Sequence, residues 1–332
     1  MPHPTLIIPF ALAPAEHARD LLATLQAPSL AQLLSHSSNV RRDAFEPYAP
    51  LLPHEQWLIG SRRENSPEIA HAVMQLLGMT TEPGYWFVLE PSHFHVARDH
   101  LVMTDRRQLA LDNATSRTLF DAAYPLFEEL GYTLRYGDAG HWLLRADGWS
   151  DLRTCSPDAA CGHNIDVWMP TGPGEREWRR LHNEVQMLWH THAINEAREQ
   201  RGEQRINALW LWGGSAGPDG QDVQQNAQPF GLRELARCRL GHPPTPTPKE
   251  QDLRLMDALI EHALASDWSG WLAELAKLDA SHLTPLLNQL KQGEIDGLGL
   301  VFTDSTHLHE WQLRRSSMKK FWVRASLARL AP

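Results

Sequence analysis

The chain has 332 residues, a length that suits one large domain or one domain carrying an insertion. Its residues are 42% hydrophobic and 21% charged, as in ordinary globular proteins. The formal net charge of −9 argues against nucleic-acid binding, which usually needs a basic surface, and no apolar run is long enough to predict a membrane span.

The N-terminal half begins with a short apolar segment, residues 5–10, which predicts a buried core strand. The residues before it lack the basic region of a signal peptide. Helical periodicity then covers residues 14–36, where Pro28 is expected to break the helix in two. Two further helices are predicted over residues 54–59 and 67–77, and an apolar strand over residues 85–91.

Residues 92–173 predict a small α+β unit. An alternating strand comes first, and a helix follows with Ser116 as its expected N-cap and Gly131 just after its end. Two strands joined by a glycine-containing turn complete the unit.

A single long helix is predicted over residues 174–200. One stripe of this helix would carry six residues spaced three and four apart, namely Trp178, Leu181, Val185, Leu188, His192 and Asn195. The two polar residues stand at the end of an apolar stripe. Because buried polar side chains need partners, they either tie the helix to a sheet or line a pocket.

The stretch RINALWLWGGSAGP, residues 205–218, predicts a strand over residues 206–212. Apolar residues fill nearly both of its faces, as in a parallel strand covered by helices on both sides. Gly213 and Gly214 would then lie at the carboxyl end of the strand, where ligand sites form in open α/β sheets.

The C-terminal part begins with a Pro-rich stretch, residues 241–250, which predicts an extended linker within the core. Helical patterns cover residues 252–265 and 282–292, and residues 297–304 predict a last core strand. The final basic segment predicts an amphipathic helix. An ordinary solvated terminal helix is favoured over a helix that docks on a membrane or a partner.

The three cysteines, Cys155, Cys161 and Cys238, are sparse and odd in number, which indicates a reducing, cytoplasmic setting. Cys155 and Cys161 lie close to His163 in the sequence. Their spacing matches no usual zinc pattern and no fourth ligand is evident, so we predict no zinc site.

Several segments resemble, in order, the archaeal-type cofactor-independent phosphoglycerate mutases. That family carries a His-Asp-Ile-like segment, then a helix ending in His-Pro-x-Asn-x-x-Arg, and then Asn-x-Ile-Trp-Leu-Trp-Gly. The matching positions here are residues 162–166, then His192, Asn195 and Arg198, and then Asn207 with residues 209–213, while Ala193 replaces the proline. The whole arrangement is most similar to a bacterial group labelled phosphoglycerate-mutase-like or RpfE-type regulatory proteins.

Weaker resemblance extends over residues 5–35, 109–145 and 283–306. In the second of these segments, His141 stands where the family places an arginine. The resemblance implies an α/β fold with an alkaline-phosphatase-like three-layer sandwich core and a smaller inserted α+β domain. The core would comprise residues 1–91 and 174–332, and the insert residues 92–173.

The chemistry of that family requires two divalent metals, held by Asp and His ligands around a Ser or Thr nucleophile. The first Asp should follow the first strand, where Pro9, Phe10 and Ala11 stand instead. After the last strand, Asp304 is present but Ser305 replaces the expected His. One carboxylate cannot hold two hard cations, because each needs several donors.

The resemblance and the missing ligands together predict a catalytically degenerate relative of the mutases, with no catalytic residue and no cofactor. It would act as a regulatory or ligand-binding protein whose partner is a phosphorylated small molecule or a regulatory protein. The candidates for a ligand-binding or structural cleft are His163, Asp166, His192, Asn195, Arg198, Asn207, Trp212, Gly213 and Gly214.

Two alternatives remain open. The protein could be an active mutase or phosphotransferase that binds Mn or Mg through relocated ligands, for which Asp304, His307 and His309 are weak candidates. It could also be a protein-interaction scaffold, in which case an exposed apolar patch is expected.

Overall fold

The computed structural model describes residues 3–60, 68–217, 230–240 and 253–331. These residues form two compact units, which we call unit 1 (residues 1–47, 52–58 and 243–332) and unit 2 (residues 48–51 and 59–242). Among the helices of the described residues, none is both long and apolar enough to span a membrane. The predicted linker at residues 241–250 lies outside the described residues.

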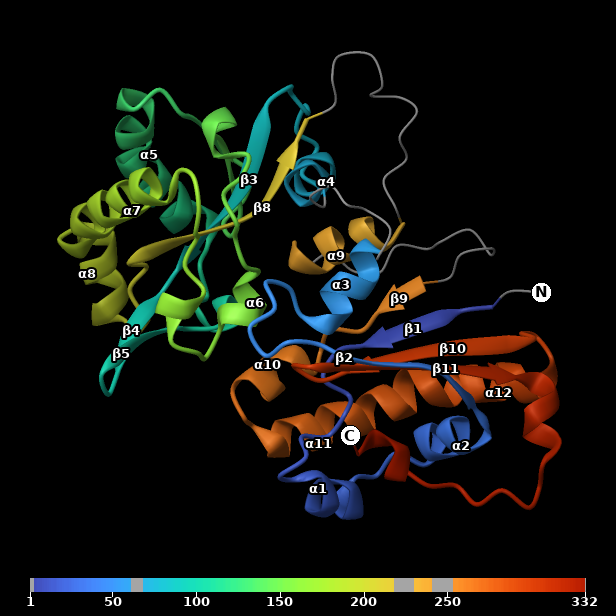
Figure 1. The fold of residues 1–332 in the computed structure, drawn as a ribbon. Helices are drawn as coiled ribbons and strands as arrows, with labels where there is room; N and C mark the ends of the chain where they lie inside the picture. The colour runs from blue at the N-terminus through green and yellow to red at the C-terminus, as the bar shows by residue number, and fades with distance from the viewer. Residues whose placement is uncertain (1–2, 61–67, 218–229, 241–252, 332) are drawn as a thin grey trace. The chain divides into compact units, whose positions relative to one another are not determined.

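Unit 1 is built on a five-stranded sheet in the order β2-β11-β10-β1-β9 (Figure 1). Its strands are β1 (Thr5–Ile8), β2 (Ser38–Ala44), β9 (Leu253–Leu255), β10 (Gly297–Thr303) and β11 (His307–Arg314). β1 runs parallel to β9 and β10, whereas β11 runs antiparallel to β10 and β2. Every residue of β10 is buried, as expected for a strand inside a covered sheet.

The helices of unit 1 are α1 (Ala18–Thr24), α2 (Pro28–His36), α3 (Pro53–Ile59), α10 (Ile260–Leu264), α11 (Trp268–Leu278) and α12 (Thr284–Gln292). The predicted break at Pro28 is confirmed, since this proline starts α2. The predicted helix over residues 252–265 is wrong in its first part, because residues 253–255 form β9 and pair with β1.

Unit 2 contains a four-stranded antiparallel sheet in the order β6-β7-β3-β8. The strands are β3 (Tyr85–Ser92), β6 (Thr133–Tyr136), β7 (Trp142–Arg145) and β8 (Ala208–Ala216), and a separate ribbon joins β4 (Phe94–Ala97) to β5 (His100–Met103). The helices are α4 (Ile69–Leu76), α5 (Asn113–Glu129), α6 (Pro157–Ala160), α7 (Glu175–His190), α8 (Ala193–Gln200) and α9 (Phe230–Arg239).

The main core of unit 2 lies on one face of this sheet. Phe87 and Leu89 of β3 and Leu209 and Leu211 of β8 pack there in a cluster with buried side chains of α5 and α7. The opposite face of β3 and β8 is contacted by α4, which also packs on α9. The two faces of β8 are therefore both covered.

The predicted parallel strand over residues 206–212 is wrong in direction. β8 runs antiparallel to β3 and stands at the edge of its sheet. The apolar run that suggested a parallel strand reflects burial of both faces, which does not depend on strand direction. Gly213 and Gly214 also lie within β8 rather than after it.

The predicted long helix over residues 174–200 is divided into α7 and α8. His192 lies between the two helices in an extended conformation, and its Nδ1 atom accepts a hydrogen bond from the backbone N–H of Ile194. An N-cap residue cannot be helical itself, so the helix ends before it. In α5 the N-cap is Asp112 rather than the predicted Ser116, which lies fully buried inside the helix.

The division of the chain into units differs from the predicted domains. The predicted boundaries at residues 91 and 174 would separate β3 and β8 from β7, yet all three strands belong to one sheet. Unit 2 therefore extends from residue 59 to residue 242, beyond the predicted insert on both sides.

Asn195 ties α8 to the segment that leads into β8. Its side-chain amide donates to the carbonyl oxygens of Trp189 and Ile206, at 3.0 and 2.8 Å, and its Oδ1 atom accepts from the N–H of Ile206 at 2.8 Å. The side chain is fully buried. The N–H and the carbonyl of Ile206 therefore both have this one amide as hydrogen-bond partner.

We expect Asn195→Ala to lower the free energy of unfolding by about 3 kcal/mol, because it leaves buried backbone groups without partners. Chemical denaturation measures the change. Gln200→Ala, which removes an exposed amide at the end of the same helix, should change it by less than about 0.5 kcal/mol. Equal effects of the two substitutions would contradict this role of Asn195.

Candidate functional site

The candidate site is built on the face of the unit 2 sheet that lies opposite the main core. Because side chains alternate along a strand, Glu90 of β3 and Trp212 of β8 point to this face while Leu89 and Leu211 point to the core. Glu90 is only 1% exposed. The indole Nε1–H of Trp212 donates to Glu90 Oε1 at 2.9 Å.

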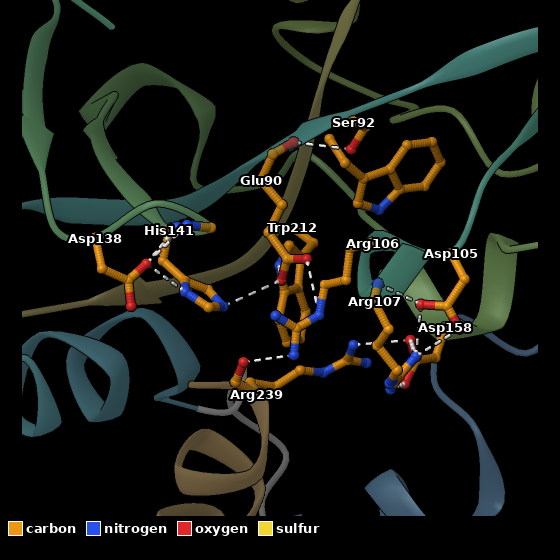
Figure 2. A network of polar contacts seen from close by, with 12 residues as sticks. Glu90, Ser92, Asp105, Arg106, Arg107, Asp138, His141, Asp158, Trp212 and Arg239 are labelled. Atoms are coloured by element: carbon orange, nitrogen blue, oxygen red, sulfur yellow. Dashed lines mark hydrogen bonds and ion pairs between the residues drawn. The ribbon is translucent and has the colours of Figure 1, made fainter. Parts of the chain in front are cut away.

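The side chains of Arg106 and His141 lie close to the buried carboxylate of Glu90 (Figure 2). The Nε atom of Arg106 lies 3.7 Å from Glu90 Oε2, and Nε2 of His141 lies 3.9 Å from Glu90 Oε1. Both distances are too long for hydrogen bonds. Among the described residues, the Glu90 carboxylate is therefore hydrogen-bonded to Trp212 alone, with the guanidinium of Arg106 close by.

His141 is oriented by Asp138, whose Oδ1 atom lies 2.8 Å from His141 Nδ1. A carboxylate can only accept, so Nδ1 carries the hydrogen and Nε2 points toward Glu90. Burial raises the pKa of Asp138, but the hydrogen bond and charge of His141 outweigh it and the pKa lies below its usual value. The imidazole itself is 2% exposed.

Three buried polar atoms in this group have no hydrogen-bond partner within the described residues: Glu90 Oε2, Arg106 Nε and His141 Nε2. Buried polar atoms in folded proteins are almost always hydrogen-bonded. Their convergence around one carboxylate indicates a place for an ordered water or for a polar group of a ligand.

A pocket of about 270 Å³ opens beside these side chains. Its polar wall is formed by Arg106, Asn113, Asp138, Gly140 and His141, and its apolar wall by Pro91, Leu109, Leu111 and Leu240. The volume suits a molecule of a few heavy atoms.

The position of Arg106 depends on a second ion network that continues behind it. Arg106 Nη2 donates to the backbone carbonyl of Arg239, whose guanidinium stacks over the Trp212 ring at 5.1 Å. Asp158 forms ion pairs with Arg239 and Arg107, each at 2.9 Å, and Arg107 also bonds Asp105 at 2.9 Å. Figure 2 shows this chain of contacts running from Asp138 to Asp105.

Asp158 is the anchor of that second network and is 5% exposed. Burial by itself would raise the pKa of Asp158, but the charges of Arg107 and Arg239 outweigh it and hold the pKa far below its usual range. Burial by itself would lower the pKa of Arg107, but the carboxylates of Asp158 and Asp105 raise it well above its usual value. Asp158 and Arg107 are therefore charged at neutral pH.

A second pocket of about 410 Å³ also lies in unit 2 and contains three of the residues predicted from the sequence, Trp212, Gly213 and Gly214. Gly213 has φ +67°, at an irregularity in the pairing of β8 with β3, and a Cβ atom there would lie 2.8 Å from Ile69. Glycine is thus required by both conformation and space. The loop that faces the glycines supplies Ser150, Asp151, Arg153 and Thr154.

Most other predicted cleft residues lie away from both pockets and bond to the backbone. Asn207 bridges the N–H and C=O of Phe94, at 2.7 and 2.8 Å, and the fully buried Arg198 donates to the carbonyl of Gln204. His192 caps α8 and Asn195 ties it to the next segment, as described above.

His163 and Asp166 are exposed and line neither pocket. The His163 ring stacks on the Trp168 ring, with centroids 6.0 Å apart. Of the nine predicted residues, Trp212, Gly213 and Gly214 line the second of the two pockets described here.

The candidate metal ligands of unit 1 lie at the turn between β10 and β11. Asp304 Oδ1 accepts from the backbone N–H groups of Thr306 and His307, at 2.7 and 2.6 Å, and Asp304 Oδ2 lies 3.0 Å from His307 Nδ1. His309 is buried on β11 against Trp311. Over the described residues, no three His, Cys, Asp or Glu side chains group so that they could hold a metal.

The sequence analysis missed Glu90, Arg106, Asp138 and Asp158, and it singled out His141 only through the resemblance. One signal was available, because Glu90 ends the otherwise apolar run YWFVLEP. A charged residue in a strand that is buried on both faces needs a partner. The other three come from loops and a short helix, and only the fold brings them together.

Comparison with known proteins gives structural likeness alone. The cofactor-independent phosphoglycerate mutase from Thermoplasma acidophilum DSM 1728 aligns over 100% of this chain and 95% of its own, with 17% identity and a TM-score of 0.44. The PH0037 protein from Pyrococcus horikoshii aligns over 94% of this chain and 87% of its own, with 12% identity and a TM-score of 0.50. No protein-family model and no curated protein matches the sequence.

The likeness to the PH0037 protein shows a shared fold over nearly the whole chain. The α/β fold class predicted from the sequence is confirmed, since both units combine helices with sheets and unit 1 contains parallel strands.

We expect Asp158→Asn to lower the free energy of unfolding by about 3–5 kcal/mol at pH 7, because two buried guanidinium groups lose a charged partner. The depressed pKa of Asp158 means that its contribution is complete above its unfolded-state value of 3.8 and is lost as the pH falls below that value. The difference between the wild type and the variant should therefore narrow below about pH 4.

Denaturation curves at a series of pH values measure this difference. Asp121→Asn serves as the matched control, since Asp121 forms an exposed ion pair with Arg117 on α5 and should contribute less than about 1 kcal/mol. A pH-independent difference for Asp158→Asn would contradict the assignment.

Proposed function

We propose that the protein is a catalytically degenerate, regulatory relative of the cofactor-independent phosphoglycerate mutases, and that it binds a small anionic molecule in the pocket beside Arg106 and His141. The observation that carries the proposal is the convergence of three unpartnered buried atoms, from Glu90, Arg106 and His141, next to that pocket. The relationship to the mutases rests on the sequence resemblance.

The donors and acceptors of the site favour one kind of ligand. Arg106 Nε offers a hydrogen to an anionic oxygen, whereas Glu90 Oε2 needs a donor such as a hydroxyl group. His141 Nε2 accepts when the ring is neutral and donates when it is protonated. A molecule with both an anionic group and a hydroxyl group satisfies this set, and a phosphorylated hydroxy acid is such a molecule.

The absence of metal-dependent catalysis is supported by the donors at Asp304. The two divalent ions that the resemblance implies require several oxygen or imidazole ligands each. Asp304 Oδ1 is already bonded to two backbone N–H groups, and Asp304 Oδ2 faces His307. These residues do not fit the ions, so we derive no metal-assisted step.

We expect 3-phosphoglycerate, used as the probe, to bind one site per chain, and Arg106→Gln to weaken binding by about tenfold or more. Asn113→Asp should also weaken it, because it adds a negative charge to the pocket wall without touching the buried network. Isothermal titration calorimetry measures both effects, with inorganic phosphate as a second probe.

The control is Arg117→Gln, which removes an exposed guanidinium of α5 outside the pocket. The Arg117→Gln variant should bind 3-phosphoglycerate with the same affinity as the wild type. The pocket assignment fails if 3-phosphoglycerate does not bind, or if Arg106→Gln and Asn113→Asp, with melting temperatures close to wild type, bind it unchanged.

We expect the purified protein to contain far less than one equivalent of divalent metal and to show no mutase turnover after addition of Mn. Elemental analysis and a mutase assay on the same sample test this. Asp304→Ala should leave 3-phosphoglycerate binding unchanged, because Asp304 serves the turn in unit 1. Stoichiometric metal together with turnover that Asp304→Ala abolishes would establish the active-enzyme alternative instead.

A further inference from the structure

The last segment of unit 1 differs in charge from the rest of the chain. Among residues 311–331, every charged residue is basic, whereas the chain as a whole carries a net charge of −9. The basic residues are Arg314, Arg315, Lys319, Lys320, Arg324 and Arg329. The predicted amphipathic helix over this segment is wrong, because only short 3-10 turns form at Arg315–Lys319 and Ala328–Leu330.

Two large aromatic side chains stand out from this segment. Phe321 is 91% exposed and Trp322 is 67% exposed, and their rings contact each other with centroids 5.1 Å apart. Lys319, Lys320 and Arg324 beside them are also exposed. We call residues 314–326 the basic aromatic loop; it is the red loop after β11 in Figure 1.

The loop is held at its first end by backbone contacts. The N–H of Arg315 donates to the carbonyl of Asp296 at 2.9 Å, and the turn continues with bonds from Lys320 to Ser317 and from Val323 to Lys320. These bonds fix the backbone on both sides of the aromatic pair.

The second end is tied to α2. Ser326 N–H donates to Ser35 Oγ at 2.8 Å, and Arg329 Nη1 donates to the carbonyl oxygens of Leu34 and Ser37, at 2.6 and 2.8 Å. Because both ends are anchored, the exposure of Phe321 and Trp322 is not the fraying of a chain end. The fold holds two aromatic rings in water, which is unfavourable unless a partner covers them.

We propose that the basic aromatic loop docks on an anionic lipid surface, with Phe321 and Trp322 entering the headgroup region and Lys319, Lys320 and Arg324 facing lipid phosphates. Aromatic rings favour this depth of a bilayer, and basic residues near the surface each add attraction to anionic lipids. The two adjacent rings lie in an exposed turn, so both can enter a headgroup layer together.

The distribution of charge favours contact between the basic aromatic loop and an anionic surface. An anionic surface repels a protein of net charge −9, but charges separated by more than about 10 Å are screened at physiological salt. The basic aromatic loop is therefore a part of unit 1 that such a surface attracts. This inference is independent of the pocket in unit 2.

The test is co-sedimentation of the full chain with vesicles of phosphatidylcholine alone, and with vesicles in which about one third of the lipid is phosphatidylglycerol. Binding is expected only to the second kind, and to weaken with added salt. The double variant Lys319→Gln/Lys320→Gln should lower the partition coefficient about 25-fold, because each lysine contributes about a factor of five. Phe321→Ala/Trp322→Ala should lower it by about tenfold or more.

Two matched controls should bind as the wild type does. Arg179→Gln/Arg180→Gln removes two adjacent exposed charges of α7, and Tyr48→Ala/Met187→Ala removes two exposed apolar side chains elsewhere. The proposal is overturned if phosphatidylglycerol vesicles do not bind, or if the variants of the loop bind like the controls. If the protein binds polyglutamate but not the vesicles, the proposal is overturned in favour of an acidic protein partner.

Discussion

The structure of unit 2 depends on a negative charge placed inside it. Glu90 lies in the middle strand of the sheet with 1% of its surface exposed. Removing a carboxylate from water costs several kcal/mol, so the surrounding residues must compensate it. Trp212 supplies a hydrogen bond, Arg106 supplies positive charge, and the Nε2 atom of His141 lies 3.9 Å from the carboxylate.

Each of these compensating groups requires a support of its own. Asp138 orients His141, and the backbone of Arg239 holds Arg106. The guanidinium of Arg239 is in turn fixed by Asp158 and by stacking on Trp212. The buried network therefore couples β3, β8 and α9 to the loops. It leaves three polar atoms of the Glu90 group without hydrogen-bond partners among the described residues, next to a pocket lined by Arg106 and His141.

Much of the fold was predictable because hydrophobic periodicity and proline or glycine signals are local. The strands at residues 5–8, 85–92 and 297–303 and the helix start at Pro28 follow from such signals. The direction of β8 did not follow, since an apolar run reports burial of both faces and not the identity of the neighbouring strand. The break at His192 was missed because a capping histidine also fits a helical stripe.

The candidate site was less predictable than the fold. Trp212, Gly213 and Gly214 were singled out because an apolar strand ending in glycines is a local pattern, and they line the second pocket. Arg106 and Asp158 come from two short helices and Asp138 from a loop, and no local pattern distinguishes them from solvated charges. The polar residues that matched the mutase pattern in sequence, such as Asn195 and Asn207, bond to backbone groups and stabilise the unit.

The most direct measurement is a crystal structure of the protein grown with 3-phosphoglycerate, at a resolution that shows ordered water. The account predicts ligand or water oxygens within hydrogen-bonding distance of Glu90 Oε2, Arg106 Nε and His141 Nε2. Direct pairing of these three side chains with one another, with no bound group between them and the pocket empty, would contradict it.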